Sequence, residues 1–233
     1  MSVNRWMVLG LIAAPAMAFS PAAARGQTVI PGLLGGDLTD PENDGDPEAD
    51  AGYNAAFSSD DEPGFGGGEN SFNVFDNQVG GGNMKWCCND ASPGNPVNGP
   101  GFQLDATLDA GAHFLTHFTL TSSNDSPDRD PSNFQILGSN DGTNFTAIYT
   151  GTVTPFTATR DQTFRFDAGA DFPTQSVAYS TFRYSVTETV GGAAHALGEI
   201  EYFGTPVPEP ATLSLLGIGA LGLLARRRRR RRA

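Results

Sequence analysis

The chain has 233 residues, of which 39% are hydrophobic, 10% aromatic and 17% charged. This composition suits one globular domain with attached segments, and it excludes a fibrous chain or a wholly disordered one. The 29 glycines and 16 prolines supply many turn positions, which favours an all-β domain over a helical bundle.

The formal net charge of −12 combines two opposed blocks. Seven of the fourteen basic residues form the run 226–232, whereas the chain from Phe19 to Val207 carries six basic and 25 acidic residues, a net charge of −19. Such a surface repels polyanions but not divalent cations or neutral sugars. We therefore predict that the protein has no nucleic-acid partner.

The N-terminus has the pattern of an export signal. A single charge, Arg5, precedes the apolar stretch Trp6–Ala18, which ends in small residues. This pattern is typical of a secretory signal peptide. We assign residues 1–24 to it and expect cleavage after Ala18 or Ala24.

The next segment, residues 25–51, is rich in acidic residues and poor in side chains that build a core. We expect an acidic flexible segment that is solvated. Its stretch Asp40–Asp46 places carboxylates at alternating positions before a glycine, which superficially matches a calcium loop. Ala51 stands where that loop needs a bidentate glutamate and Pro41 is awkward within it, so the solvated segment is the favoured interpretation.

From residue 52 onward, apolar residues alternate with polar ones between clusters of Gly, Asn, Asp and Pro. No sustained 3.6-residue period occurs before the C-terminal tail. About eight short strands are expected, which predicts a β-sandwich. The clearest runs are Phe102–Leu108, Phe114–Leu120, Phe134–Gly138, Phe164–Phe166, Phe182–Val186 and Ile200–Tyr202.

The C-terminal tail, residues 205–233, has three parts in a fixed order: the motif Pro208-Glu209-Pro210, the apolar run 211–225 and the arginine cluster 226–232. The tail closely resembles the PEP-CTERM sorting signal of diderm bacteria. That resemblance implies a short transmembrane helix in the inner membrane and processing by an exosortase-type peptidase. It also implies delivery to the cell surface or extracellular matrix. An apolar helix of this length rises about 22 Å, short of the roughly 30 Å hydrocarbon core, and the arginines favour a cytoplasmic C-terminus.

Four landmarks in residues 52–204 carry a second resemblance. They are Phe75-Asp76-Asn77 followed by Lys85-Trp86, the polar stretch 121–131, the turn Gly138–Gly142 between two strand-like runs, and the closing stretch Leu197–Gly204. In this order they resemble the galactose-binding-like jelly roll of discoidin and carbohydrate-binding module family 32 domains. The resemblance implies an all-β jelly-roll sandwich that binds sugar.

The same resemblance implies a structural calcium ion between the early aspartate segment and the closing strand. The matching residues are Asp76 and Glu199, with Asn77 contributing a carbonyl oxygen. Oxygen ligands from two distant segments suit a hard cation. The flexible connection Gly80–Gly82 departs from the family pattern, and the alternative is that both acids are ordinary turn and edge residues.

Sugar binding in these modules uses loops at one end of the sandwich, with planar polar groups and an aromatic platform. The candidates are Arg129 with Asn124, Asp125 and Asp128, and Trp86 with Asn89 and Asp90. Two alternatives are favoured: Arg129 forms ion pairs with the flanking Asp128 and Asp130 that hold its own loop, and Trp86 belongs to the core.

The only cysteines, Cys87 and Cys88, are adjacent. In an exported chain they form a vicinal disulfide, pair between molecules or remain thiols. Their number excludes a zinc framework. A vicinal disulfide would offer a rigid apolar surface to a sugar.

No catalytic motif is present, and His113 and His117 alternate along one strand without an acidic or cysteine partner. We expect the two histidines to share one face and to be structural. The sequence thus predicts an exported, non-catalytic carbohydrate-binding module with a calcium ion, whose partner is exopolysaccharide or surface glycan. The alternative is a structural or adhesive matrix protein that binds protein or itself and has no sugar site.

Overall fold

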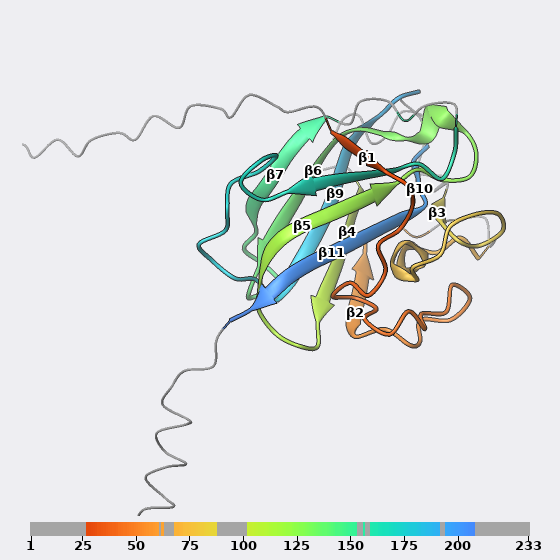
Figure 1. Ribbon diagram of the computed structural model, residues 1–233. Coiled ribbons are helices and arrows are strands. Elements are labelled where there is room, and N and C mark those ends of the chain that lie inside the picture. Colours follow the sequence, from red (N-terminus) through yellow and green to blue (C-terminus); the bar gives the residue numbers. More distant parts are fainter. Residues whose placement is uncertain are drawn as a thin grey trace, which may run out of the picture.

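The computed structural model describes residues 27–60, 62, 68–87, 102–152, 156, 159–191 and 194–207. Two antiparallel sheets pack face to face around one core (Figure 1). This confirms the jelly-roll β-sandwich expected from the sequence. The predicted signal peptide lies outside the described residues, as does the sorting tail after residue 207 with its apolar helix, while residues 205–206 of the predicted tail belong to β11. Within the described ranges, the structure has no helix of the length and hydrophobicity that a membrane span requires.

The larger sheet has five strands in the order β2-β4-β9-β6-β7, and the smaller has four in the order β1-β8-β5-β11. A separate two-stranded ribbon pairs β10 with β3, and two short 3-10 helices, η1 and η2, lie in the loops. The elements are β1 Thr28–Ile30, β2 Ala55–Ser59, η1 Ser71–Phe75, β3 Trp86–Cys87, β4 Phe102–Leu108, β5 His113–Thr121, η2 Pro127–Arg129, β6 Pro131–Ser139, β7 Thr146–Thr152, β8 Thr163–Asp167, β9 Thr181–Thr189, β10 Ala196–Leu197 and β11 Glu199–Pro206.

The core follows from the period-two pattern of the strands, because every second side chain points between the sheets. Phe118 of β5 lies at its centre and stacks on Phe166 of β8, with ring centroids 4.6 Å apart. Its other faces meet Tyr149 at 5.5 Å and Phe134 at 6.4 Å. Aromatic rings from both sheets therefore join the two layers.

The predicted turn between Gly138 and Gly142 joins β6 to β7. Gly142 has φ +67°, a left-handed conformation that glycine adopts without steric cost. Its N–H donates to Ser139 Oγ at 3.0 Å, and the Asp141 carboxylate accepts the N–H groups of Thr143 and Asn144. The residues that the sequence analysis assigned to this turn therefore make the hydrogen bonds that close the hairpin.

The structure corrects the expectation that residues 25–51 are solvated and precede the domain. Residues 28–30 form β1, which pairs with β8, and Asp37, Thr39 and Asp40 are buried. The prediction failed because this segment is held mainly by hydrogen bonds, with Leu38 as its apolar contact to the core. Its polar groups satisfy one another and the backbone, so the domain begins before residue 52.

The two strand histidines do not share a face. β5 contains a bulge, seen as a register shift against β11 between Phe203 and Gly204. An extra residue reverses the alternation of side chains beyond it. His113 is buried with its Nδ1 2.9 Å from the Gly111 carbonyl oxygen, whereas His117 stacks on Phe203.

We predict that Phe118→Ala lowers the free energy of unfolding by about 3–5 kcal/mol, because it leaves a cavity between the sheets. Phe203→Ala should cost far less, because that ring is only partly buried and contacts His117 outside the core. Urea unfolding of both variants measures the difference. Equal losses would contradict the position of Phe118 as the centre of the core.

Candidate metal centre and ligand-binding face

The loops that hold the candidate residues gather at the end of the sandwich where β11 begins (Figure 1). The orange segment after β1 and the yellow segment around η1 lie beside the start of β11 in this view. The green loop that contains η2 follows β5, and Thr121 at the end of β5 pairs with Glu199 at the start of β11. The two sets of candidate residues therefore lie at the same end of the domain.

Asp76, Asn77 and Glu199, which the sequence placed together, are together in the structure. The backbone N–H of Asn77 donates to Glu199 Oε1 at 3.1 Å, and that of Gln78 donates to Asp76 Oδ1 at 2.8 Å. Asn77 has φ +55°, a conformation that Asn tolerates better than most residues. Asp76 and Glu199 are 1% and 0% exposed.

Three oxygen atoms of this cluster are buried without a hydrogen-bond partner: Asp76 Oδ2, Glu199 Oε2 and Asn77 Oδ1. Burial raises the pKa of Asp76 to about 7. Burial, and next to it the negative charge of Asp76, raises the pKa of Glu199 well above its usual range. Buried oxygens that lack donors and come from distant segments are the donor set that a hard cation such as Ca²⁺ prefers, so these residues fit such an ion.

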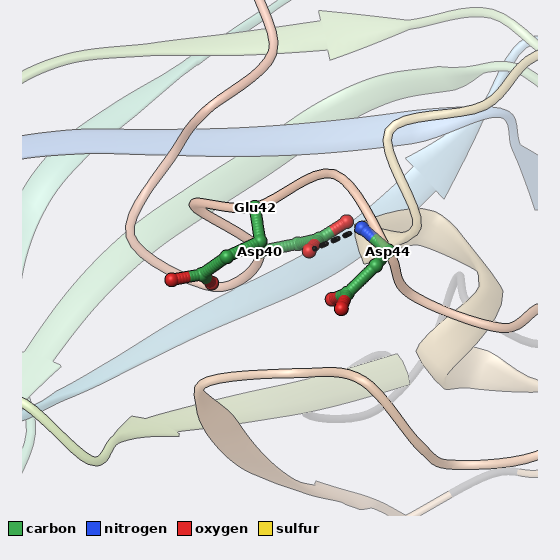
Figure 2. Close-up of side chains that lie close together, drawn as sticks. All are labelled: Asp40, Glu42 and Asp44. Atoms are coloured by element: carbon green, nitrogen blue, oxygen red, sulfur yellow. Dashed lines mark hydrogen bonds between the residues drawn. The ribbon is translucent and has the colours of Figure 1, made fainter.

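A second acidic group lies in the N-terminal segment, where Asp40, Glu42 and Asp44 offer oxygens within 4.8 Å of one another. Figure 2 shows that the Glu42 and Asp44 carboxylates point in different directions. Asp40 Oδ1 accepts the Asp44 N–H at 3.0 Å, and Glu42 accepts from Asn54 Nδ2 at 2.8 Å. Hydrogen bonds within the protein therefore fix the shape of this turn.

Lys85 organises the loop after β5, a role that the sequence analysis missed. Its buried Nζ donates to Asn124 Oδ1 at 2.8 Å and Asp125 Oδ2 at 3.0 Å, and it lies 3.3 Å from Glu69 Oε1. Two proposed sugar ligands, Asn124 and Asp125, are thus engaged in holding the loop. The one signal in the sequence was that Lys85 directly precedes Trp86, a residue that could be buried in a strand.

Arg160 joins the two ends of the same loop. Its guanidinium binds both carboxylate oxygens of Asp130, at 2.5 and 2.8 Å, and donates to the Ser123 carbonyl oxygen at 2.9 Å. The sequence favoured Arg129 as the partner of Asp130. Arg160 takes that role from a distant segment, which no local pattern predicts.

Arg129 is partly buried at the end of η2, and its Nη1 lies 3.5 Å from Cys87 Sγ. Asp128 beside it is exposed, while its backbone oxygen accepts the Gly191 N–H. Cys87 is disulfide-bonded. Cys88, Asn89 and Asp90 lie outside the described residues.

Trp86 is not a platform for a sugar: it is 1% exposed and packs edge-to-face on Phe102 and His195, with centroids 6.5 and 4.9 Å apart. The structure therefore corrects its assignment as a ligand-binding residue. The reason is the pairing of β3 with β10, which turns the indole into the core. His195 is also buried, and its Nε2 lies 3.1 Å from the Tyr184 hydroxyl.

The comparison with protein families finds a PEP-CTERM protein-sorting motif at residues 206–231. This confirms the sorting signal inferred from the tail. No curated protein matches the chain.

Solved structures with a similar fold are carbohydrate-binding modules of Clostridium perfringens. The structure of the CBM32-1, CBM32-2 and M60 catalytic domains of ZmpB has a TM-score of 0.51 and 12% identity, and the match covers 82% of this chain but 17% of that one. CpGH89CBM32-5, solved with GalNAc-β-1,3-galactose, has 18% identity and a TM-score of 0.43 and covers 65% and 96% of the two chains. The family 32 module of NanJ, solved with galactose, has 14% identity and a TM-score of 0.46 and covers 64% and 93%. At these identities the likeness concerns the fold alone. Of the three matches, the one to ZmpB has a TM-score above 0.5 and supports the similarity of fold.

We predict that His195 makes the fold sensitive to acid. Burial lowers its pKa to about 3 from an ordinary value near 6.5. The unfolded chain therefore binds a proton that the folded chain excludes, and the stability that neutral His195 provides is lost as the pH falls from 6.5 toward 3.

The effect should approach 1.4 kcal/mol for each pH unit well below 6.5. Urea unfolding of the wild type and His195→Gln across this range isolates it, because glutamine can still bond the Tyr184 hydroxyl but does not titrate. The wild type should lose more stability than the variant. Parallel pH profiles would rule out the histidine as the cause.

Proposed function

We propose that this protein is an exported, non-catalytic module that binds carbohydrate, with exopolysaccharide or cell-surface glycans as its partner. The carbohydrate-binding-module fold and the sorting motif support this function. The observation that carries it is a loop, residues 122–130, that is fixed at both ends and carries Arg129 near the end of β3.

The rigidity of this loop matters because a ligand that binds weakly cannot offset the entropy lost when a flexible site becomes ordered. Lys85 holds the first half of the loop, and Arg160 joins Ser123 at its start to Asp130 at its end. Arg129 lies between them, and a planar guanidinium donates two parallel hydrogen bonds to neighbouring sugar hydroxyls. The exposed carboxylate of Asp128 is a suitable acceptor for a further hydroxyl. Cys87 and Cys88, joined as a vicinal disulfide, would add an apolar surface beside them.

Calcium is the second part of the proposal. Asp76, Glu199 and the carbonyl of Asn77 would hold one Ca²⁺ that joins the segment after η1 to β11. The ion would neutralise two buried carboxylates at the end of the domain that carries the loop. Its role would be structural, because it would fasten two distant segments of the chain to each other.

The location follows from the two ends of the chain. The N-terminal signal would direct export across the inner membrane of a diderm bacterium. The PEP-CTERM tail would hold the chain in that membrane until an exosortase-type peptidase removes it. The domain would then remain at the cell surface or in the extracellular matrix.

The rival function is a structural or adhesive matrix protein that associates with protein or with itself. The exposed apolar side chains Val29, Leu34 and Val177 offer contacts for such a role. Competition distinguishes the two, because free monosaccharide displaces a sugar-binding module but leaves a packing interface intact.

We predict that the full-length protein binds specific glycans on an array of bacterial polysaccharides. Arg129→Ala should weaken that binding about tenfold or more, because it removes charged hydrogen bonds worth about 1.5–3 kcal/mol. Arg165→Ala is the matched control, because that arginine pairs with Asp167 on β8. Array signal followed by titration of the best glycan measures both variants.

Two results would contradict the assignment. Equal affinity of Arg129→Ala and Arg165→Ala would exclude Arg129 from the sugar site. An array without signal, from protein shown to be folded by circular dichroism, would favour the structural role.

We predict that calcium at about a hundred times its dissociation constant stabilises the fold by about 2.7 kcal/mol. Asp76→Asn and Glu199→Gln should abolish this gain. In chelator both variants should be at least as stable as the wild type, because they remove a buried charge that has no counter-ion. Thermal unfolding with calcium and with EGTA tests this, with the exposed Asp109→Asn as control. A wild type that is insensitive to calcium would refute the metal centre.

A further inference from the structure

A hollow of about 120 Å³ lies on the outer face of the larger sheet. It is lined by polar side chains of β2, of the residue after β2, of β4 and of β9: Ser58, Ser59, Asp60, Gln103, Asp105 and Arg183. Ser58 pairs with Asp105 and Asp105 pairs with Arg183, so these three residues form one row across the sheet. Their neighbours Leu104 and Phe182 are buried in the core, and the row therefore faces outward.

Arg183 is fixed at this hollow by contacts on two sides. Its Nε and Nη2 atoms donate to the two carboxylate oxygens of Asp105, at 2.5 and 2.8 Å. Its guanidinium carbon lies 3.7 Å from the centre of the Phe145 ring. A guanidinium has five N–H groups, and the pair with Asp105 uses two of them. Within the described ranges Nη1 makes no hydrogen bond, so a donor held in one position borders the hollow.

Three further side chains of the hollow keep hydrogen-bonding atoms without a partner. Asp60 Oδ1 accepts the Gln103 N–H at 2.7 Å, and the Asp60 N–H donates to the Gln103 carbonyl oxygen at 3.2 Å. These two bonds hold Asp60 in place and leave its Oδ2 atom for another donor. The Gln103 amide and the Ser58 hydroxyl make no hydrogen bond to any described residue.

The rows beside the hollow show that polar side chains on this face are able to pair across the strands. The Oγ1 atoms of Thr107 and Thr181 lie 3.0 Å apart, and Gln135 Nε2 donates to Thr150 Oγ1 at 3.0 Å. Both contacts join residues on neighbouring strands. The unpaired Gln103 amide therefore distinguishes the hollow from the rest of the described face.

The charges around the hollow disfavour an anionic ligand. Asp105 neutralises Arg183, and Asp60 adds a negative charge beside them. Partial burial raises the pKa of Asp60, and the charges of Arg183 and Asp105 also act on it. With all three side chains ionised the hollow has a net negative charge, which repels a phosphate, a sulfate or a uronic acid.

The unpaired atoms match the hydroxyl groups of a neutral sugar. A hydroxyl both donates and accepts, so it satisfies an arginine donor and a carboxylate acceptor together. The Gln103 amide offers a donor and an acceptor in one plane for a neighbouring hydroxyl. The hollow is smaller than the pockets of roughly 300–1,000 Å³ that enclose a whole ligand. One edge of a sugar ring therefore enters it, while the rest stays in solvent.

We propose that this hollow is a second sugar site, which binds a neutral sugar residue through Arg183, Asp60 and Gln103. The site goes beyond the proposed function, because it shares no residue with the 122–130 loop and its ligand class follows from its own polar groups. The fixed guanidinium and the clamped Asp60 carboxylate orient the hydroxyls, and the Gln103 amide adds a further pair of hydrogen bonds.

The first test locates binding in the full-length protein by NMR, through the Arg183 Nε–H signal. The neutral probes are glucose, galactose and mannose, and the acidic probes are glucuronate and galacturonate. At least one neutral sugar should shift the signal to saturation, and its acidic counterpart should shift it far less at the same concentration. No shift with the three neutral sugars would overturn the proposal, as would a larger shift with a uronate. A shift with free lysine alone would overturn the ligand class.

The second test measures the affinity of the neutral sugar that gives the largest shift. Gln103→Ala should weaken binding about fivefold, because it removes uncharged hydrogen bonds. The matched control is Gln135→Ala, the same substitution on the same face outside the hollow, and it should leave the affinity unchanged. Neither substitution alters the pair of Asp105 with Arg183. Equal affinities of the two variants would overturn the proposal.

The outcomes also separate this site from the one proposed at Arg129. A shift of the Arg183 signal that persists in Arg129→Ala would support the hollow as an independent site. Glycan binding that Arg129→Ala abolishes, without any shift at Arg183, would overturn the second site and keep the proposed function.

Discussion

The burial of carboxylates at the start of β11 is the constraint on which this end of the molecule depends. Glu199 opens the strand and Asp76 follows η1, and neither side chain reaches water. Taking an ionised carboxylate out of water costs several kcal/mol unless donors or a cation replace the water. Backbone N–H groups serve one oxygen of each residue and leave the other without a donor.

Nearby carboxylates show how the chain solves the same problem without a metal. Asp37 is buried too, but it accepts the N–H groups of Thr39, Asp40 and Tyr202 and the Thr39 hydroxyl. Glu201 is likewise saturated by two N–H groups and a hydroxyl. Asp76 and Glu199 differ because each has one oxygen without a donor. We therefore regard their oxygens as a candidate metal site, and we regard the fully hydrogen-bonded Asp37 and Glu201 as structural residues.

The loop around Arg129 shows a different use of charge. Lys85 and Arg160 are each bound by acidic or carbonyl groups on the chain segment between β5 and β6. The Arg160–Asp130 pair is largely shielded from water, whereas the Asp125 side chain of the Lys85 pair is 48% exposed. Breaking a shielded pair leaves a charge without a partner, so such pairs resist separation more than surface pairs do. Two of the internal basic residues, Lys85 and Arg160, therefore fix the geometry of this loop, whereas Arg165 and Arg183 pair with acids on the strands.

The sequence predicted those features that depend on local pattern. Alternation identified β4, β5, β6, β8, β9 and β11, and the stretch Gly138–Gly142 identified the hairpin, whereas β1, β2, β3, β7 and β10 were not among the clearest runs. The contact of Asp76 with Glu199 came from family resemblance, because nothing in their spacing links them. The burial of Asp40 was missed because a segment buried through hydrogen bonds leaves no apolar period. Trp86 was assigned to two roles because a two-residue strand is too short to show which way its side chain points. His113 and His117 were placed on one face because the sequence pattern does not show the bulge in β5.

The most direct measurement is a crystal structure of the protein grown with calcium, with anomalous diffraction data collected at long wavelength. We predict one anomalous peak beside Asp76 Oδ2 and Glu199 Oε2, with oxygen ligands at about 2.3–2.6 Å. A well-ordered site without a peak, in which Asp76 and Glu199 share a proton, would contradict the metal centre.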